Sequence, residues 1–440
     1  MGEMQGTRVE VEITGVAHGG VMVARHEGRV VFVSDAIPGE RVVVEITDDS
    51  KKSFWRADVV EVVEASEHRR PHVWAEAAVD RPPADRAGGA EFGHIDLAFQ
   101  RELKRRVLTE SLERMAGVVS DVVVEALPAG SVPADASPAS APAPDVDGTG
   151  WRTRVRLHVG DDGRAGPYAA RSHRVIPVES LPLAVDEVRS IAPLDESFSG
   201  ADFVDIVVPS TGNPFVIAGQ SAPAGGRGAA GAKRQKKPRA NRIVERVGDR
   251  EFRLDADGFW QVHRHAAATL TSAVQSSVDE ADFDPTASNL DLYGGVGLLA
   301  AALGDRFGRS VRVTSVESDE RATDHAAHNL SDWVGAAAVT ARVDAYLRSL
   351  TATAGAAERA RLTRATVVLD PPRSGAGKGV VSDLAALGPQ NIVYVACDPV
   401  ALARDVALFA ERGYSLTALR AFDLFPSTHH VEAVATLRRE

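Results

Sequence analysis

Apolar and polar residues alternate with a period of two along residues 7–64. In the stretch RVEVEIT every second residue is Val or Ile, and glutamates stand between them. GRVVFVSDAIPGERVVVEIT and WRADVVEVVEA repeat the pattern, and Gly and Pro separate the apolar runs. This periodicity is typical of short strands joined by tight turns. The segment is therefore predicted to form a small β-barrel.

The pattern changes twice further along the chain. Residues 95–117 have helical spacing and end in Gly117. From residue 286 onward, Val-, Ile- and Leu-rich strands such as SNLDLY, VRVTSVES, ATVVLD and NIVYVA alternate with helical segments. Buried strands separated by helices indicate a mostly parallel sheet with helices on both faces. The predicted fold class is α/β, preceded by the small barrel and a central α+β region.

Two stretches have the composition of linkers rather than of folded elements. Residues 126–150 are rich in Pro, Ala, Ser and Asp, and residues 221–242 are rich in Gly and Ala. The second stretch ends in KRQKKPRANR, residues 233–242, which holds six basic residues and no acid. This basic insertion suits either an RNA-backbone tether or a surface insertion with incidental charge. Likewise, KKSFWRA places basic groups beside Phe54 and Trp55, which suits either nucleic acid or a solvated hairpin.

Composition restricts the classes of function. The 440 residues carry a formal net charge of −11, which argues weakly against a nucleic-acid partner, although local charge matters more than the sum. A single cysteine excludes an intramolecular disulfide and any Cys-based zinc or iron–sulfur site built from this chain alone. The N-terminal residues MGEMQGTRVEVE lack the apolar region of a signal peptide, so none is expected, and no apolar run is long enough to span a bilayer. We therefore expect a cytoplasmic protein with no membrane partner, and a monomer.

Two motifs predict a nucleoside-containing cofactor. DLYGGVG follows a strand and opens a helix, and its glycines allow a ligand to approach the backbone. Glu317 ends the next strand, about two dozen residues later, where an acid can hold a ribose diol. This pair of features does not distinguish NAD from S-adenosylmethionine (SAM).

Three further residues stand at strand ends. Asp370 begins a stiff Asp-Pro-Pro loop, and Cys397 precedes a helix whose N-terminus favours thiolate. Glu432 starts the last strand and is costly to bury without a partner or a task. The alternatives are a turn for the loop, a buried small hydrophobe for Cys397 and a salt bridge for Glu432. His429 and His430 have no third ligand beside them, so no metal site is predicted.

The ordered set of motifs GFWQVH, DLYGGVG, VESD, LDPPRSG, YVACDPVALARD and FPSTHHVEAV resembles the SAM-dependent RNA 5-methyluridine methyltransferases. The resemblance covers most of the chain. It implies an OB-like TRAM barrel for RNA binding at 1–65, a central α+β domain at 66–250 and a Rossmann-like class I methyltransferase domain at 251–440. It also implies RNA as the partner, with ribosomal RNA favoured over transfer RNA by analogy.

The resemblance assigns roles to particular residues. Cys397 would add to C6 of uracil so that C5 can attack the methyl group of SAM, and Glu432 would remove the C5 proton. The residues implied to line the SAM pocket are Gln261, Tyr293, Gly295, Glu317, Asp344 and Asp370. The target uridine is expected to leave its stack.

The chain departs from the family pattern at several positions. Many members carry a four-cysteine iron–sulfur site, but here RPPADRAGGAEFGHIDLAFQ and LPLAVDE stand in the corresponding stretches, so no cluster is expected. Asp398 and Leu298 replace frequent asparagines, and Asp398 opposes thiolate formation. Two alternatives remain. One is an RNA base amino-methyltransferase, disfavoured because Arg373 replaces its stacking aromatic residue, and the other is a non-catalytic RNA-binding protein.

Overall fold

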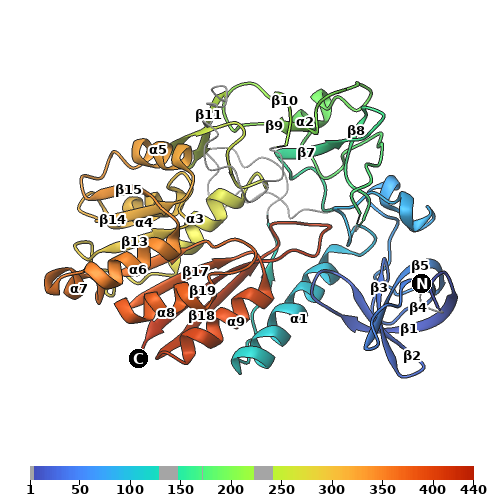
Figure 1. Cartoon of the computed structure of the whole chain (residues 1–440), viewed down its shortest axis with the longest axis horizontal. Helices are drawn as coiled ribbons and strands as arrows, with labels where there is room; N and C mark the ends of the chain where they lie inside the picture. The colour runs from blue at the N-terminus through green and yellow to red at the C-terminus, as the bar shows by residue number, and fades with distance from the viewer. Residues whose placement is uncertain (1–3, 128–146, 171, 222–240) are drawn as a thin grey trace, which may run out of the picture. The chain divides into compact units, whose positions relative to one another are not determined.

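The computed structural model describes residues 4–127, 147–170, 172–221 and 241–440. Within these ranges the chain forms two compact units (Figure 1). Unit 1 comprises Met1–Leu97, Val146–Ile243 and Asp255–Gly258, and unit 2 comprises Ala98–Asp145, Val244–Leu254 and Phe259–Glu440. The three-domain division expected from the sequence stays a prediction. Most of the linker at 126–150 and of the basic insertion at 221–242 lies outside the described residues.

Unit 1 begins with the predicted barrel. Its strands are β1 (Arg8–Val16), β2 (Met22–His26), β3 (Arg29–Ser34), β4 (Arg41–Asp48) and β5 (Phe54–Glu64). They close in the order β1-β2-β3-β5-β4. The alternating apolar residues fill the interior, with Val11, Ile13, Val31, Val33, Val42, Val44 and Ile46 all buried. The small β-barrel predicted from the period-two pattern is therefore confirmed.

The aromatic residues of KKSFWRA belong largely to this packing. Trp55 is only 5% exposed, and the guanidinium of Arg29 lies 4.5 Å from the centre of its ring. Phe54 is half-buried and meets the ring of Phe32 at a centroid distance of 5.3 Å. Of the two interpretations of this stretch, the hairpin with buried aromatics describes Trp55.

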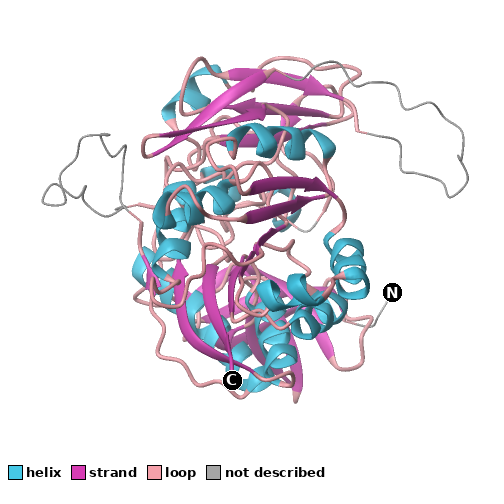
Figure 2. Cartoon of the chain, turned by 90° about the vertical axis from the view of Figure 1, so that its left-hand side faces the viewer, coloured by secondary structure: helices cyan, strands magenta, loops and turns pink. Residues whose placement is uncertain are grey.

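The rest of unit 1 combines a small sheet with short helices. Figure 2 colours the helices and strands of the described residues. The small sheet has the order β10-β9-β7-β8. The strands are β7 (Arg154–Val159), β8 (Ala165–Gly166), β9 (Phe203–Val207) and β10 (Phe215–Gly219), with α2 (Asp186–Ile191) and short 3-10 helices at Ala75–Ala77 and Pro83–Asp85. β11 (Arg242–Val247) pairs with β12 (Arg250–Asp255), and most of this hairpin, Val244–Leu254, belongs to unit 2. Arg154 of β7 is buried and donates to the carbonyl of Gly258 at 2.8 Å.

Unit 2 is built on a mixed sheet with the order β15-β14-β13-β16-β17-β19-β18-β6. The strands are β6 (Val124–Glu125), β13 (Asn289–Leu292), β14 (Val313–Glu317), β15 (Ala336–Thr340), β16 (Thr366–Leu369), β17 (Asn391–Ala396), β18 (Tyr414–Phe422) and β19 (Glu432–Arg439). β13 to β17 run parallel, whereas β19 runs antiparallel between β17 and β18. The order in which strands are added reverses between β13 and β16, and open α/β sheets bind ligands at such a point.

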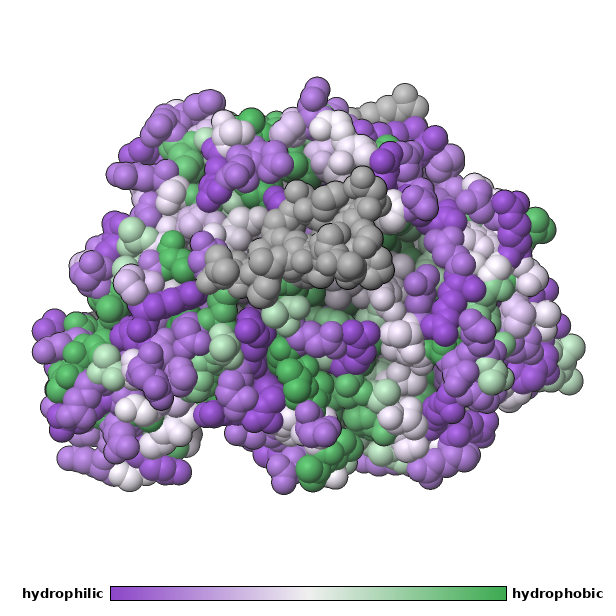
Figure 3. Space-filling model, turned by 180° about the vertical axis from the view of Figure 1, so that it is seen from behind, coloured by the Kyte–Doolittle hydropathy of each residue, from purple (hydrophilic) through white to green (hydrophobic). Residues whose placement is uncertain are grey.

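Helices cover both faces of this sheet. They are α1 (Leu97–Ala116), α3 (Ala266–Ser276), α4 (Leu298–Phe307), α5 (Glu320–Asn329), α6 (Val343–Thr353), α7 (Ala356–Leu362), α8 (Gly377–Leu387) and α9 (Pro399–Ala410). Leu290 and Leu292 point into a core shared with α6, α8 and α9. Asp291 lies between them on the opposite face and accepts from the backbone N–H of Ala300 in α4. The face drawn in Figure 3 carries both hydrophilic and hydrophobic residues. In the described part of the chain, no helix is long and apolar enough to cross a membrane.

Helix α1 uses buried polar side chains to hold the loop between β18 and β19. Lys104 is completely buried, and its Nζ donates to Asp423 Oδ1 at 2.5 Å and to the carbonyl of Phe425 at 3.0 Å. One turn earlier, the buried side chain of Gln100 accepts from the backbone N–H of Ser427 at 2.8 Å. Ser427 has a φ of 65°, a conformation that non-glycine residues rarely adopt. Together these contacts hold the backbone that leads into β19 in one conformation, which stabilises the unusual φ of Ser427.

Breaking the buried ion pair should destabilise unit 2. Replacing Lys104 by Met leaves the Asp423 carboxylate without its cation, so the free energy of unfolding should fall by about 3–5 kcal/mol in urea titrations. The double variant K104M/D423L should recover part of this loss because no unpaired charge remains. Lys378→Met, at an exposed lysine of α8, is the control. Equal urea midpoints for K104M and K378M would contradict the role of the pair.

Candidate functional site

The glycine-rich turn after β13 is shaped by close contacts that only glycine permits. A Cβ atom at Gly294 would lie 2.0 Å from Ser315 Oγ and 2.6 Å from Asp291 Oδ2. Gly297 has a φ of 90° where it begins α4. Tyr293 also has a positive φ, 63°, which is strained for an aromatic residue. Strain of this kind is concentrated at ligand sites, and here it lies at the carboxyl edge of the sheet.

Glu317 is held beside this turn by backbone donors. Its Oε2 accepts from the N–H of Gly295 at 3.2 Å, and its Oε1 accepts from the N–H groups of Ser318 and Asp319 at 2.5 and 2.9 Å. The structure therefore joins Glu317 and Gly295 directly, and the role of Glu317 in holding a ribose stays a prediction. The space where a Cβ of Gly295 would lie is open to 4 Å, so a ligand can approach this backbone.

Asp370 follows β16 at the same edge. Its N–H donates to the carbonyl of Leu292 at 3.2 Å, which ties the Asp-Pro-Pro loop to the end of β13. Burial, and then the charge of Asp291, raise the pKa of Asp370 to about 7. Burial also raises the pKa of Asp291 to about 7, and its Oδ1 has no hydrogen-bond partner among the described residues. This edge therefore concentrates acidic groups that bind protons at neutral pH.

The ladder between β17 and β19 brings Cys397 and Glu432 together. It pairs Ala396 with Ala433 in antiparallel register; Cys397 directly follows β17, and Glu432 is the first residue of β19. Residues directly opposite one another have Cβ atoms about 4.5–5.5 Å apart. The charge of Glu432 is, after burial, the largest influence on the Cys397 thiol. Glu432 is 4% exposed, and its carboxyl group accepts no hydrogen bond from the described residues.

The expectation that the helix N-terminus favours a Cys397 thiolate is wrong for the free protein. Burial, followed by the charges of Glu432 and Asp370, raises the pKa of the thiol to about 12, although Arg373 lowers it. Asp398 caps α9 with its own carboxylate, which accepts from the N–H of Ala401 at 2.8 Å. The Asp398 carboxylate therefore occupies a backbone donor at the helix N-terminus, and its negative charge further raises the pKa of the Cys397 thiol. Burial also raises the pKa of Glu432 well above its usual value, and the charge of Asp370 adds to this.

The remaining predicted cofactor residues differ in how closely they approach this edge. Burial, and then the charge of Asp344, raise the pKa of Tyr293 to about 12, so Asp344 lies near the glycine turn. Asp344 stands in the first turn of α6 and is bound by Arg342 and Arg348. Gln261 is half-buried in the connection between β12 and α3, and its side chain forms no hydrogen bond within the described residues. Its place in a cofactor pocket stays a prediction.

Sequence reasoning missed residues that shape the loop after Asp370. Asp405 is completely buried in α9 and accepts from the hydroxyl of Tyr394 and the N–H of Ala376, both at 2.7 Å. Neighbouring Arg404 donates to the carbonyl of Ser374 at 2.8 Å. An acid within the apolar helix PVALARDVALFA was the signal that could have revealed Asp405. Lys104, on the apolar stripe of its helix, gave a similar signal.

The donor set fits a nucleoside cofactor carrying a positive charge. A carboxylate beside an open glycine backbone suits ribose hydroxyls, and the acids at the edge suit a cation. Within the described residues, no group of three His, Cys, Asp or Glu side chains could hold a metal ion.

Comparisons with known proteins agree with this arrangement. The TRAM domain model matches residues 2–60, and the tRNA (Uracil-5-)-methyltransferase model matches residues 246–440. An uncharacterized RNA methyltransferase of Streptomyces avermitilis is 38% identical over 98% of both chains. One of Streptomyces coelicolor is 38% identical over 98% of this chain and 93% of its own.

The crystal structure of Pyrococcus abyssi tRNA (uracil-54, C5)-methyltransferase in complex with S-adenosyl-L-homocysteine shares the fold. Its TM-score is 0.64 at 22% identity, over 97% of this chain and 99% of that chain. The expected barrel and methyltransferase folds are confirmed, and the matched family removes the basis for an amino-methyltransferase or a non-catalytic protein. The chain belongs to the SAM-dependent RNA (uracil-5)-methyltransferase family and carries an N-terminal TRAM domain.

Proposed function

We propose that this enzyme methylates C5 of a uridine in RNA through a covalent bond between Cys397 and C6 of the base. The observation that carries the proposal is the register of β17 and β19, which sets Cys397 and Glu432 at adjacent ends of one antiparallel ladder. A nucleophile and a carboxylate side by side are what addition and subsequent elimination require.

We assign the SAM site to the glycine turn and the acids around it. Glu317 would accept from the ribose hydroxyls, and the backbone at Gly295 would allow the nucleoside to approach. Tyr293, Asp344 and Asp370 border the same edge, and Gln261 is retained from the family resemblance. SAM supplies a methyl group on a sulfonium cation when it is bound. The Oδ1 of buried Asp291, which has no partner among the described residues, is a further hydrogen-bond acceptor behind the turn.

The thiol of Cys397 must lose its proton before it can add to C6. Its raised pKa means that the free enzyme holds a neutral thiol at pH 7. Positive charge brought to this edge lowers the pKa of the thiol, as Arg373 already does in part. The nucleophile therefore becomes reactive only in the loaded site, which protects the cysteine from side reactions.

Glu432 would complete the reaction by accepting the proton from C5. Loss of that proton lets the C6–S bond break, which returns the thiolate and restores the aromatic ring. The raised pKa of Glu432 makes its carboxylate a stronger base than an ordinary glutamate. Because its carboxyl group makes no hydrogen bond within the described residues, it can turn to the substrate without breaking one.

The class of RNA is a further part of the proposal. The TRAM domain supports an RNA target, and analogy favours ribosomal RNA. The Pyrococcus abyssi protein of the same fold acts on transfer RNA, by its name, so transfer RNA is the alternative. A cytoplasmic location and a monomeric state also remain predictions.

The reactivity of the single cysteine tests the electrostatics of the site. Glu432→Gln removes a carboxylate that opposes thiolate formation, so Cys397 in this variant should react several-fold faster with iodoacetamide at pH 9. As the pH is lowered and Glu432 takes up its proton, the two rates should converge. Peptide mass spectrometry measures the labelling, with exposed Glu411→Gln as the control. A ratio of rates independent of pH would show that Glu432 does not act on the thiol.

Methyl transfer from labelled SAM to total RNA lacking 5-methyluridine tests the function. The wild type should form labelled 5-methyluridine, and Cys397→Ala should form none, because the nucleophile is lost. Glu432→Gln should accumulate protein–RNA adduct because elimination stalls. Nucleoside mass spectrometry identifies the product, and RNA fractionation identifies the substrate class. A different methylated nucleoside, unaffected by C397A, would refute the proposal.

A further inference from the structure

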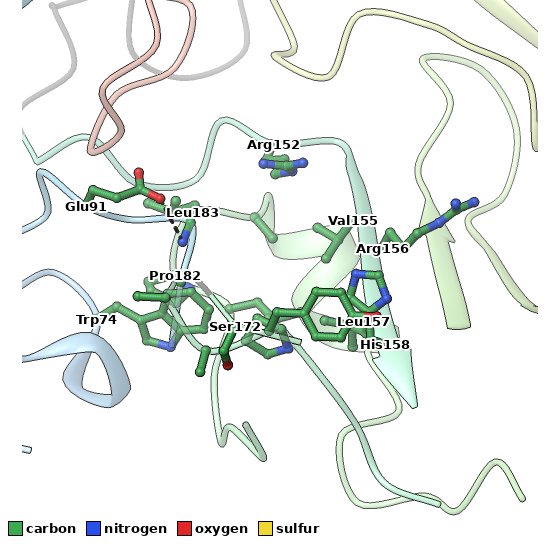
Figure 4. Close-up of a pocket in the computed structure, with 18 residues that line it drawn as sticks. Trp74, Glu91, Arg152, Val155, Arg156, Leu157, His158, Ser172, Pro182 and Leu183 are labelled. Carbon is green, nitrogen blue, oxygen red and sulfur yellow. Dashed lines mark hydrogen bonds between the residues drawn. The ribbon is translucent and has the colours of Figure 1, made fainter. Parts of the chain in front are cut away.

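Unit 1 contains a pocket of about 380 Å³ that the methyl-transfer chemistry does not use (Figure 4). Its floor is apolar and comes from β7 and from the segment around Leu183. Figure 4 shows Trp74 and Glu91 on one side of it and Leu157 and His158 on the other. A volume of this size suits one nucleotide-sized ligand.

One wall of the pocket is a preformed aromatic stack. The rings of His158 and Tyr168 lie 3.6 Å apart with an interplanar angle of 8°, and His173 meets the edge of Tyr168. Burial, and then the charge of Arg156, lower the pKa of His158, so its ring is neutral at pH 7. A neutral, flat wall of this kind stacks well on a nucleobase.

The opposite side offers one donor and one acceptor. Trp74 is 5% exposed, and its indole N–H has no acceptor among the described residues. An unsatisfied buried donor is costly, so a ligand that supplies an acceptor gains by meeting it. Glu91 contributes a carboxylate whose Oε1 accepts from the N–H of Gly89 at 3.2 Å. Carboxylates accept hydrogen bonds from the exocyclic amino groups of bases.

Two arginines give the pocket a positive border. Arg156 is exposed but fixed, because its guanidinium donates to both oxygens of Asp205 and lies 4.1 Å from the centre of the Phe203 ring. Arg152 lines the same pocket. Guanidinium groups at the border of a flat, partly apolar pocket are the arrangement that binds a base and its phosphate.

We propose that this pocket binds one unpaired nucleobase of the RNA substrate, separate from the methylated uridine, and that it prefers a base with an exocyclic amino group. Glu91 accepts from the amino group, Trp74 donates to a ring acceptor, and the His158–Tyr168 pair provides the stacking wall. Uracil carries a carbonyl oxygen where adenine and cytosine carry the amino group, so in the same orientation it would place an acceptor against the Glu91 carboxylate. The proposal rests on RNA as the partner of this family and deepens the proposed function by adding a second base contact.

Fluorescence anisotropy with short oligo(A), oligo(C) and oligo(U) tests this site without requiring turnover. The full-length enzyme is saturated with S-adenosylhomocysteine so that its adenosine site is filled. Oligo(A) or oligo(C) should bind more tightly than oligo(U). Tyr168→Ala should weaken that binding roughly five- to tenfold, whereas Tyr168→Phe, which keeps the ring, should not. Glu91→Gln should abolish the preference over oligo(U), and exposed Glu196→Gln is the matched control.

The same variants separate this site from the catalytic one. In methyl-transfer assays Y168A and E91Q should raise KM for RNA and leave kcat unchanged, because neither residue touches the reacting atoms. Equal affinity for the three oligonucleotides, or wild-type affinity in Y168A, would overturn the nucleobase pocket. Either result would leave the Cys397 mechanism intact, and loss of methyl transfer in C397A would not bear on the pocket.

Discussion

The antiparallel direction of β19 is the constraint on which the catalytic arrangement depends. The parallel strands β13, β14, β16 and β17 all end at one edge of the sheet, so residues that follow them gather there. A further parallel strand would have brought its last residue to this edge. Because β19 runs the other way, it brings its first residue, Glu432, to lie opposite Cys397. The contacts of Gln100 and Lys104 to the preceding loop fix where that strand begins.

In the free protein, the electrostatics at the carboxyl edge of the sheet oppose formation of the Cys397 thiolate. Asp370, Glu432 and Cys397 all have raised pKa values because burial and mutual repulsion disfavour their charged forms. The free site is therefore close to neutral. In the proposed mechanism, a cationic cofactor and an electron-poor ring would change the balance in the direction of the thiolate. Catalytic sites often hold groups with shifted pKa values, because the protonation state of such a group changes readily when a charged ligand binds.

The sequence predicted those features that depend on local pattern. Alternation located the barrel strands, and the spacing from the glycine turn to Glu317 suggested one shared site, where the structure shows a direct hydrogen bond between them. It could not reveal the charge state of Cys397, because burial by distant strands outweighs the local helix terminus. Lys104 and Asp423 are more than three hundred residues apart, so no local pattern links them. The pocket in unit 1 likewise joins segments that only the fold brings together.

The covalent bond between Cys397 and the base is the central claim, and RNA containing 5-fluorouridine tests it most directly. Fluorine at C5 cannot leave as a proton, so the adduct should persist after methyl transfer. Mass spectrometry of the enzyme incubated with SAM and this RNA should find a methylated fluorouridine on Cys397, and none on Cys397→Ser. Normal methylation of unsubstituted RNA, with no adduct on Cys397 in the substituted RNA, would contradict the covalent route.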